Sequence, residues 1–348
     1  MVVTPKHNGE PRRVVDFQAL NDHAPRQTHH TETPWSLVSS VPPNQVKSVL
    51  DCFHGYHSVP IAEEDRPYTT FLTPYGRYRY KSCPQGFLAA GDAYSHRMDL
   101  IVEDIPRLRK CIDDSLLYDS DIETNFYRVC NFLETCSKQG CVFNPEKFQF
   151  GEQKVKFLGF NITKDGVTPT EDFLQNIRSF PIPKTITNIR SWYGAVAQIS
   201  YAFSTAPIMQ PFKHLLSTKT PFQWSPDLEA AFQASKEEIV WQCQTGVKSF
   251  DPNLLTALAT DWSKLAMGFW LCQKHCKCES IKPGCCNEGW QTIYVGSRFC
   301  SPAESRYAPI EGEMLAAVWA MEKCRFFLLG MKTFTLALDH KPLINRNR

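Results

Sequence analysis

Residues 110–119 read KCIDDSLLYD, and this stretch decides how the first half of the chain is interpreted. Apolar residues stand on both sides of Asp113 and Asp114, which predicts a buried hairpin with two acids at its centre. Two ionised carboxylates in such a place repel each other and are costly to desolvate, and a bound divalent cation removes that cost. Because Mg²⁺ prefers carboxylate oxygens, the pair is a candidate magnesium site. A solvent-exposed turn rich in aspartate is the alternative.

A third acid strengthens the first interpretation. Asp51 ends an apolar run in LDCFHGYHSVPI, residues 50–61. Four further stretches follow it in order, namely CPQGF (83–87), CIDDSLLY (111–118), FNPEKFQFG (143–151) and VKFLGF (155–160). Each motif is weak alone, but five in this order are specific.

Together these motifs resemble the successive polymerase motifs of reverse transcriptases, most closely those of gypsy-type LTR retrotransposons. The resemblance implies an α+β fold, a right-hand polymerase with fingers, palm and thumb. It also implies an RNA-directed DNA polymerase that adds deoxynucleotides to a primer 3′ end. Such enzymes use two Mg²⁺ ions roughly 4 Å apart on shared carboxylates. The implied partners are an RNA or DNA template with its primer, and deoxynucleoside triphosphates.

The resemblance assigns a role to each residue that matches a motif. Asp51, Asp113 and Asp114 would be catalytic metal ligands, and Tyr56 would exclude a ribose 2′-hydroxyl. The remaining roles are pocket floor for Gln85 and Gly86, triphosphate binding for Arg12, and protonation of the leaving pyrophosphate for Lys147. Each has a structural alternative: Tyr56 as core packing, Gln85 as a turn cap, and Arg12 and Lys147 as solvated surface.

A second acidic set lies near the C-terminus. TDWSKLAMGFWL (260–271), the long helical stretch that contains Glu313, and ALDHKPL (337–343) resemble a gypsy-type RNase H domain. Asp261, Glu313 and Asp339 would be its metal ligands and catalytic residues, acting by a two-metal mechanism. Glu311 competes with Glu313, but the residues after Glu313 fit the family order better.

The resembled domains extend further than this sequence at both ends. Since few residues follow Asp339, the RNase H-like α/β domain is expected to be incomplete and its activity weak or absent. The fingers are expected to be N-terminally short. A catalytically inactive nucleic-acid-binding relic of a retroelement is therefore the alternative function, and a metal nuclease that uses only the second acidic set is a third.

Two further patterns suggest binding. TPYGRYRYKS (73–82) alternates, so in a strand Arg77, Arg79 and Lys81 would form one face and Tyr78 and Tyr80 the other. A basic face suits a template backbone, although a hairpin with its tyrosines packed inward is equally consistent. Separately, residues 272–286 are dense in thiols. They predict a Zn²⁺ site or a reactive thiol loop from His275 and five cysteines, Cys272, Cys276, Cys278, Cys285 and Cys286.

Length and composition set the remaining expectations. The 348 residues predict two or three domains, which we place at 1–165 (fingers and palm), 166–250 (thumb and connection helices) and 251–348 (RNase H-like). No apolar run is long enough for a membrane span and no signal peptide is visible, so an intracellular chain, cytoplasmic or nuclear, with no membrane partner is expected. The net charge of +2 argues neither for nor against nucleic-acid binding, because binding depends on a local basic surface.

Local patterns add two detailed expectations. Residues 157–162 are expected to form one strand. In the helix after residue 309, the apolar residues Met314, Ala317, Val318, Met321 and Leu328 are expected to face the core.

Overall fold

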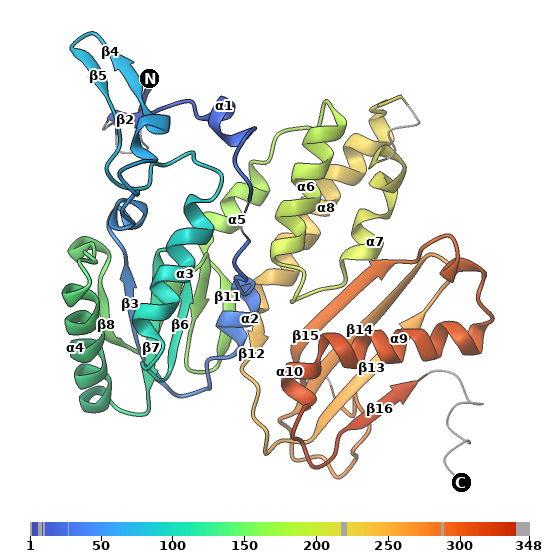
Figure 1. The fold of residues 1–348 in the computed structure, drawn as a ribbon. Helices are drawn as coiled ribbons and strands as arrows, with labels where there is room; N and C mark the ends of the chain where they lie inside the picture. Colours follow the sequence, from blue (N-terminus) through green and yellow to red (C-terminus); the bar gives the residue numbers. More distant parts are fainter. Residues whose placement is uncertain are drawn as a thin grey trace. The chain divides into compact units, whose positions relative to one another are not determined.

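The computed structural model describes residues 2–5, 9, 11–26, 28–216, 221–286 and 289–338. They divide into two compact units (Figure 1). The first contains the described residues up to Val38 and those from Gln45 to Leu158. The second contains Ser39–Asn44 and the described residues from Gly159 onward, so the helices after residue 170 share a unit with the C-terminal sheet. Among the described residues, no helix is both long and apolar enough to cross a bilayer.

The first unit is built on a four-stranded antiparallel sheet in the order β6-β7-β3-β8. Its strands are β3 (Val46–Asp51), β6 (Leu108–Cys111), β7 (Asp114–Asp119) and β8 (Gln149–Glu152). Two helices, α3 (Ala90–Val102) and α4 (Ile122–Lys138), pack on one face of this sheet. Asp121 caps α4 by accepting a hydrogen bond from the Thr124 amide at 2.8 Å.

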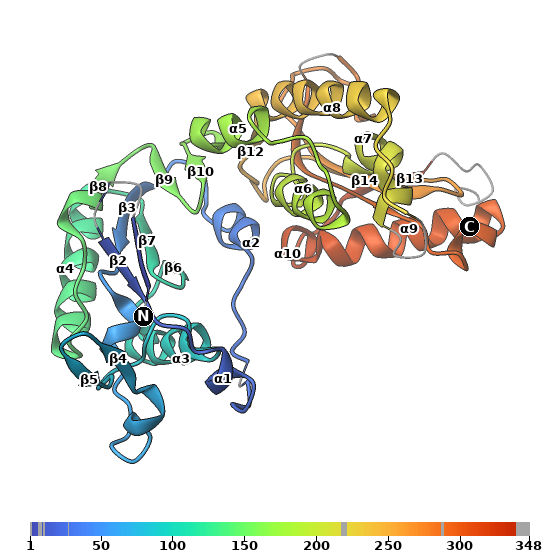
Figure 2. The same cartoon turned by 90° about the horizontal axis from the view of Figure 1, so that it is seen from above.

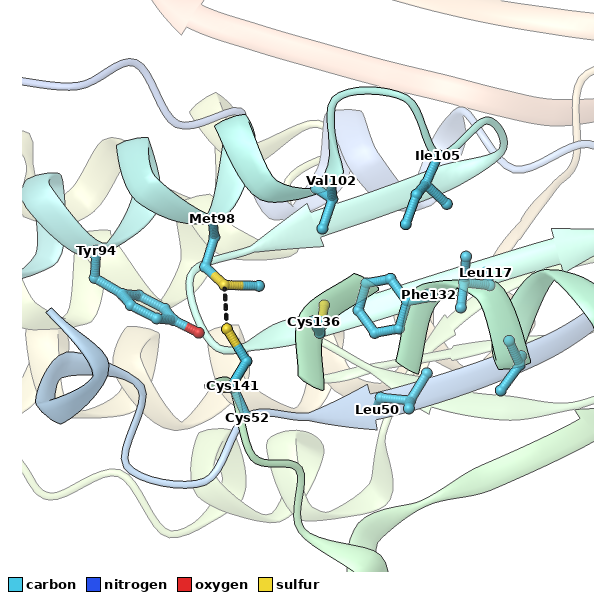
Figure 3. Packing of buried hydrophobic residues seen from close by; sticks show 11 residues of the cluster. Leu50, Cys52, Tyr94, Met98, Val102, Ile105, Leu117, Phe132, Cys136 and Cys141 are labelled. Atoms are coloured by element: carbon cyan, nitrogen blue, oxygen red, sulfur yellow. Dashed lines mark hydrogen bonds between the residues drawn. The ribbon is translucent and has the colours of Figure 1, made fainter. Parts of the chain in front are cut away.

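The core between this sheet and its helices fixes the strands that carry the first acidic set. Leu50 and Leu117 from the strands meet Met98 of α3 and Phe132 of α4, and all four side chains are almost fully buried (Figure 3). Side chains alternate along a strand, so the neighbouring odd positions of β3 face away from the helices. The core therefore determines which side of the sheet Asp51 faces.

Smaller elements complete the first unit. They are β1 (Val2–Pro5), β2 (Pro11–Val14), α1 (Gln18–Asn21), α2 (Pro34–Ser39), η1 (Gly55–Ser58), η2 (Arg66–Thr69), β4 (Phe71–Thr73), β5 (Gly76–Tyr78), η3 (Pro145–Lys147) and β9 (Val155–Phe157). Strand pairs β1–β2 and β4–β5 each form an antiparallel hairpin.

The second unit begins after a turn. Leu158 and Gly159 both have positive φ, 53° and 83°, so one strand ends at Phe157 and the next begins at Phe160. The single strand expected over residues 157–162 is therefore wrong. Strands β10 (Phe160–Ile162), β11 (Gly166–Pro169) and β12 (Val247–Lys248) pair antiparallel here.

A series of helices follows. They are α5 (Glu171–Arg178), α6 (Ile186–Gln198), α7 (Thr205–Met209), η4 (Gln210–Leu216) and α8 (Pro226–Thr245) (Figure 2). Thr170, Thr185 and Ser225 cap α5, α6 and α8 with their hydroxyl oxygens. Trp192 of α6 and Phe232 of α8 pack edge to face, with ring centroids 5.0 Å apart.

The C-terminal sheet has the order β15-β14-β13-β16. Its strands are β13 (Thr256–Trp262), β14 (Ala266–Lys274), β15 (Trp290–Phe299) and β16 (Thr335–Leu338), and β16 is parallel to β13. Helix α9 (Pro309–Lys323) lies across this sheet and is followed by α10 (Arg325–Leu328), with η5 (Glu304–Arg306) before it (Figure 1).

The face that α9 turns to the sheet differs from the expected one. Small residues, Gly312, Ala316 and Ala320, are buried there. Met314 and Val318 are 50% and 57% exposed, so the apolar stripe expected to face the core is wrong at those two positions. Because the helix is apolar on most sides, several faces could be buried. The face with small residues packs on the sheet, since small side chains allow the helix to approach closely.

Candidate functional site

Strand register brings the first acidic set together. Asp51 and Asp114 are direct partners in the antiparallel pairing of β3 with β7. Partners of this kind have side chains on the same side of the sheet, with Cβ atoms roughly 5 Å apart. Asp113 precedes β7 in the tight turn that joins it to β6, where Ile112 has φ of 52°. The backbone fixes this turn, since the Cys52 amide donates to the Asp113 carbonyl at 2.8 Å.

Burial and like charge make ionisation of these aspartates unfavourable. Burial, followed by the charge of Asp51, raises the pKa of Asp113. The same causes raise the pKa of Asp114 to about 6. Among the described residues, Asp113 Oδ1 is buried and accepts no hydrogen bond. Carboxylate oxygens are the ligands that Mg²⁺ prefers, and strand register and the adjoining turn bring these three carboxylates to the same end of the sheet.

One ammonium group lies in the cluster. Lys147, at the end of η3, donates to Asp51 Oδ2 at 2.9 Å. Asn144 caps this short helix by accepting from the Glu146 amide, which positions the Lys147 side chain. The hydrogen bond to Asp51 raises the pKa of Lys147, which keeps the amine protonated. Lys110, which pairs with Asp99 at 3.0 Å, also acts to lower the pKa of Asp113. The ammonium groups near the cluster therefore compensate only part of the negative charge of the three carboxylates.

Gly55 and Tyr94 complete the cluster, and neither was among the predicted site residues. A Cβ atom at Gly55 would lie 2.5 Å from Asp113 Oδ1 and 2.5 Å from Tyr94 Cζ. Tyr94 is fully buried in α3 and its ring meets the Tyr56 ring edge to face, with centroids 5.6 Å apart. Gly55 lies inside a motif that the sequence singled out, whereas Tyr94 lies in no motif and gave no signal.

The other predicted residues of the first unit line the region beside the carboxylates. Tyr56 is half-buried in η1, and burial, followed by the charge of Asp113, raises its pKa. Gly86 has φ of 92°, and its carbonyl accepts from Asn21 Nδ2 at 3.0 Å. Asn21 also accepts from the Leu88 amide, so it holds the loop that carries Gln85. Arg12 lies in β2, and its side chain is outside the described residues.

The β4–β5 hairpin exposes both basic and aromatic side chains. Arg77 of β5 is exposed, as are Arg79 and Lys81, which follow the strand because β5 ends at Tyr78. The strand expected to carry all three basic residues is therefore shorter than predicted. Tyr78 and Tyr80 both meet Phe71, with ring centroids 6.1 Å and 5.4 Å away, so the tyrosines lie on one side of the hairpin. Tyr78 nevertheless remains 49% exposed. The hairpin thus packs its tyrosines on Phe71 and keeps part of one ring and its basic groups accessible.

The second acidic set is only partly described. Trp262, the residue after Asp261, packs against α9 so closely that a Cβ atom at Gly312 would lie 2.2 Å from its ring. Glu313, the next residue of α9, is 8% exposed, whereas Asp261 is exposed. Strand β16 ends at Leu338, whose register partner is Thr260. Asp339 lies outside the described residues.

The two competing glutamates have different environments. Glu311 accepts from the Ala308 amide at 3.0 Å and so caps the start of α9. Glu313 faces inward beside Gly312. Glu311 is therefore engaged at the start of the helix, whereas Glu313 is buried between α9 and the sheet.

Four of the five predicted cysteines converge. The sulfurs of Cys276, Cys278, Cys285 and Cys286 all lie within 4.8 Å of one another. The fifth, Cys272, is fully buried in β14 and its thiol donates to the Ala257 carbonyl, so it packs in the sheet core and is not part of the cluster. The His275 side chain is also outside this group of four.

Comparison with known proteins identifies related families in both units. Residues 5–162 match the family described as reverse transcriptase (RNA-dependent DNA polymerase). Residues 251–347 match the RNase H-like domain found in reverse transcriptase. The Transposon Tf2-7 and Tf2-3 polyproteins of Schizosaccharomyces pombe are 24% and 23% identical over 99% of this chain. The chain spans about a quarter of the length of these relatives, 25% in each case.

Solved structures show the same fold. A foamy viral protease-reverse transcriptase dRH in complex with double-stranded DNA is 20% identical, with a TM-score of 0.78, and the match covers 94% of this chain and 56% of that one. The foamy viral protease-reverse transcriptase in complex with RNA/DNA hybrid is also 20% identical, with a TM-score of 0.73 over 94% of this chain and 43% of that one. The expected fold, a right-hand polymerase followed by an RNase H-like domain, is confirmed.

Proposed function

We propose that this chain, which contains a reverse transcriptase domain and an RNase H-like domain, is an RNA-directed DNA polymerase of a gypsy-type retroelement. It would add deoxynucleotides to a primer 3′ end by a two-metal mechanism. The observation that carries the proposal is the register pairing of Asp51 with Asp114, with Asp113 in the adjoining turn. In this proposal, residues 1–165 form the fingers and palm, residues 166–250 the thumb and connection helices, and residues 251–348 the RNase H-like part.

The three aspartates supply the oxygen ligands that a pair of Mg²⁺ ions requires. When bound, such ions would activate the primer hydroxyl and stabilise the charge of the leaving pyrophosphate. Asp113 Oδ1, buried with no hydrogen bond from any described residue, is suited to this role. The raised pKa values of Asp113 and Asp114 have the same origin as metal affinity, since both follow from gathered negative charge in a half-buried place.

The chain's other residues would bind and orient the substrates. The Tyr56 ring, held from behind by Tyr94, would exclude a ribose 2′-hydroxyl. Gln85 and Gly86 would contact the sugar from a loop that Asn21 fixes. Arg12 would bind the triphosphate, and Lys147, protonated beside Asp51, would give a proton to the pyrophosphate as the bond to the α-phosphorus breaks. The exposed basic side chains of the β4–β5 hairpin would bind the template backbone.

Primer extension on poly(rA)/oligo(dT) with Mg²⁺ tests the polymerase. Asp113→Asn should lower extension at least about 100-fold, because removal of one group that stabilises a transition state costs that much. Asp104→Asn, in an exposed loop after α3, is the matched control and should retain full activity. Extension that persists in Asp113→Asn would disprove the triad. A wild-type chain that binds RNA/DNA hybrid but extends no primer would support the non-catalytic relic instead.

We also propose that Asp261, Glu313 and Asp339 form the metal site of the RNase H-like part. The burial of Glu313 beside the Gly312–Trp262 contact favours this assignment. Any cleavage of the RNA strand of a hybrid should be abolished by Glu313→Gln. Glu311→Gln is the matched control, because glutamine can still accept the capping hydrogen bond of Ala308. Equal cleavage by both variants would remove Glu313 from the site.

A further inference from the structure

Four cysteine side chains lie close together in the connection between β14 and β15. Cys276 and Cys278 follow β14, and Cys285 and Cys286 precede β15. All four are free cysteines, and their sulfurs lie within 4.8 Å of one another. The sulfurs of Cys276 and Cys285 are 3.4 Å apart. The four sulfurs thus surround a common centre and are not arranged as two bonded pairs.

This spacing suits a tetrahedral zinc ion. Zn–S bonds are about 2.3 Å long, so the sulfurs of a tetrathiolate site lie roughly 3.8 Å apart. We propose that Cys276, Cys278, Cys285 and Cys286 bind one structural Zn²⁺ ion in a closed four-cysteine site. Two ligands come from each end of the connection, so the ion joins the strand that enters the loop to the strand that leaves it.

The backbone around the thiols is built to hold them close. A Cβ atom at Gly289 would lie 2.6 Å from the sulfurs of both Cys276 and Cys286, so only glycine fits there. The His275 amide donates to the Gly289 carbonyl at 2.7 Å and closes the neck of the loop.

The loop has little else to hold it. Among the described residues 275–286, none is buried, so the segment has no hydrophobic core of its own. A metal ion is the usual way to stabilise a segment of this kind. Cys285 also packs against the core cluster of Ala257, Cys272 and Trp290, which attaches the site to the end of the sheet.

Charge in the segment complements the site. Four thiolates and one Zn²⁺ carry a net charge of about −2. Lys274, Lys277 and Lys282 lie within or next to the loop, and Lys274 Nζ donates to the Cys278 carbonyl. Glu279 and Glu288 belong to the same connection, so the ammonium groups exceed the carboxylates by one charge and offset only part of the negative charge of the zinc-bound thiolates.

Metal analysis of the full chain tests the proposal. The chain, purified in reducing buffer with zinc supplied, should contain one equivalent of zinc by mass spectrometry. Cys278→Ser/Cys286→Ser should lose it, whereas Cys130→Ser, which removes an exposed thiol from α4, should retain it. After chelation, Co²⁺ should give the visible absorption of a tetrahedral thiolate complex in the wild-type and control chains only.

Two results would overturn the proposal. One is a folded wild-type chain, judged by circular dichroism, that binds neither Zn²⁺ nor Co²⁺. The other is equal metal content in the double-serine variant and the wild type. The double-serine variant should retain primer extension, so failure of this proposal and failure of the polymerase proposal are distinguishable.

Discussion

The acidic residues of the two units lie on different kinds of secondary-structure element. In the first unit, Asp51 and Asp114 are paired by the register of neighbouring strands, and Asp113 is held by the turn between β6 and β7. In the second unit, Asp261 lies on a strand and Glu313 on a helix, and the contact of Trp262 with Gly312 joins the two elements. Backbone hydrogen bonds therefore place the three aspartates of the first unit, whereas the strand of Asp261 and the helix of Glu313 meet through side-chain packing.

This difference predicts where each site is vulnerable. A change of a few tenths of an ångström beside the first set moves a carboxylate directly, because Asp113 itself borders the space at Gly55. The same change beside the second set moves a tryptophan ring and reaches the carboxylates only through it. The first site should thus respond in activity, and the second unit in stability.

Among the substitutions that test this comparison, Gly55→Ala is expected to have the largest effect. Its Cβ would meet Asp113 Oδ1 and the buried ring of Tyr94, and Tyr94 has no room to retreat. Since displacement of a catalytic group by about 1 Å can cost 100-fold in rate, primer extension should fall by about that factor. Gly194→Ala, on a helix with no atom within 4 Å of the added Cβ, should leave extension unchanged. Full activity in Gly55→Ala would show that the carboxylate is not confined as the structure indicates.

The sequence anticipated the first set better than the second. Asp113 and Asp114 interrupt an apolar run and Asp51 ends one, so the pattern singled out all three as candidates, but only the fold shows that Asp51 pairs with Asp114. Gly55 has no side chain to give a periodic signal, and its importance comes from Tyr94, which lies far along the chain. Pairing and close approach depend on tertiary contacts, which local patterns do not encode.

The second unit shows the limits of periodicity more clearly. Met314 and Val318 follow a helical spacing, yet α9 buries Gly312 and Ala316 instead. A helix that is apolar on most sides has no unique buried face in its sequence, and packing against Trp262 selects the small residues. The prediction that Cys272 belongs to the thiol cluster fails for a similar reason. Side chains alternate along β14, and the Cys272 side chain lies on the face that packs in the sheet core, away from the other four thiols.

A smaller effect is expected from Gly312→Ala, the counterpart of the first substitution. The added Cβ would lie 2.2 Å from the Trp262 ring and force it out of place. Overpacking of this kind costs about 1–3 kcal/mol, so urea unfolding followed by tryptophan fluorescence should show the C-terminal unit destabilised by about 3 kcal/mol. Primer extension under native conditions should stay at the wild-type level. A loss of extension equal to that of Gly55→Ala would contradict the distinction between the two sites.

The smallest effect concerns the strand that carries Asp51. Lys47, the second residue of β3, is fully buried. Its ammonium group donates hydrogen bonds to the carbonyls of Gln45 and Gln153 at 2.7 Å and 3.0 Å. Burial lowers the pKa of Lys47 to about 8. The folded chain therefore releases this proton at a lower pH than the unfolded chain, whose lysine titrates near 10.4. Between these values the unfolded state binds more protons, so stability contributed by this group rises with pH.

From pH 8 to pH 10 this contribution should amount to about 2 kcal/mol, from 1.36 kcal/mol per pKa unit. Other groups titrate in the same range, so the measurement is the difference in unfolding free energy between wild type and Lys47→Met at each pH. That difference should shift in favour of the wild type as pH rises. A difference that stays constant with pH would mean that Lys47 keeps an ordinary pKa although its side chain is buried in β3.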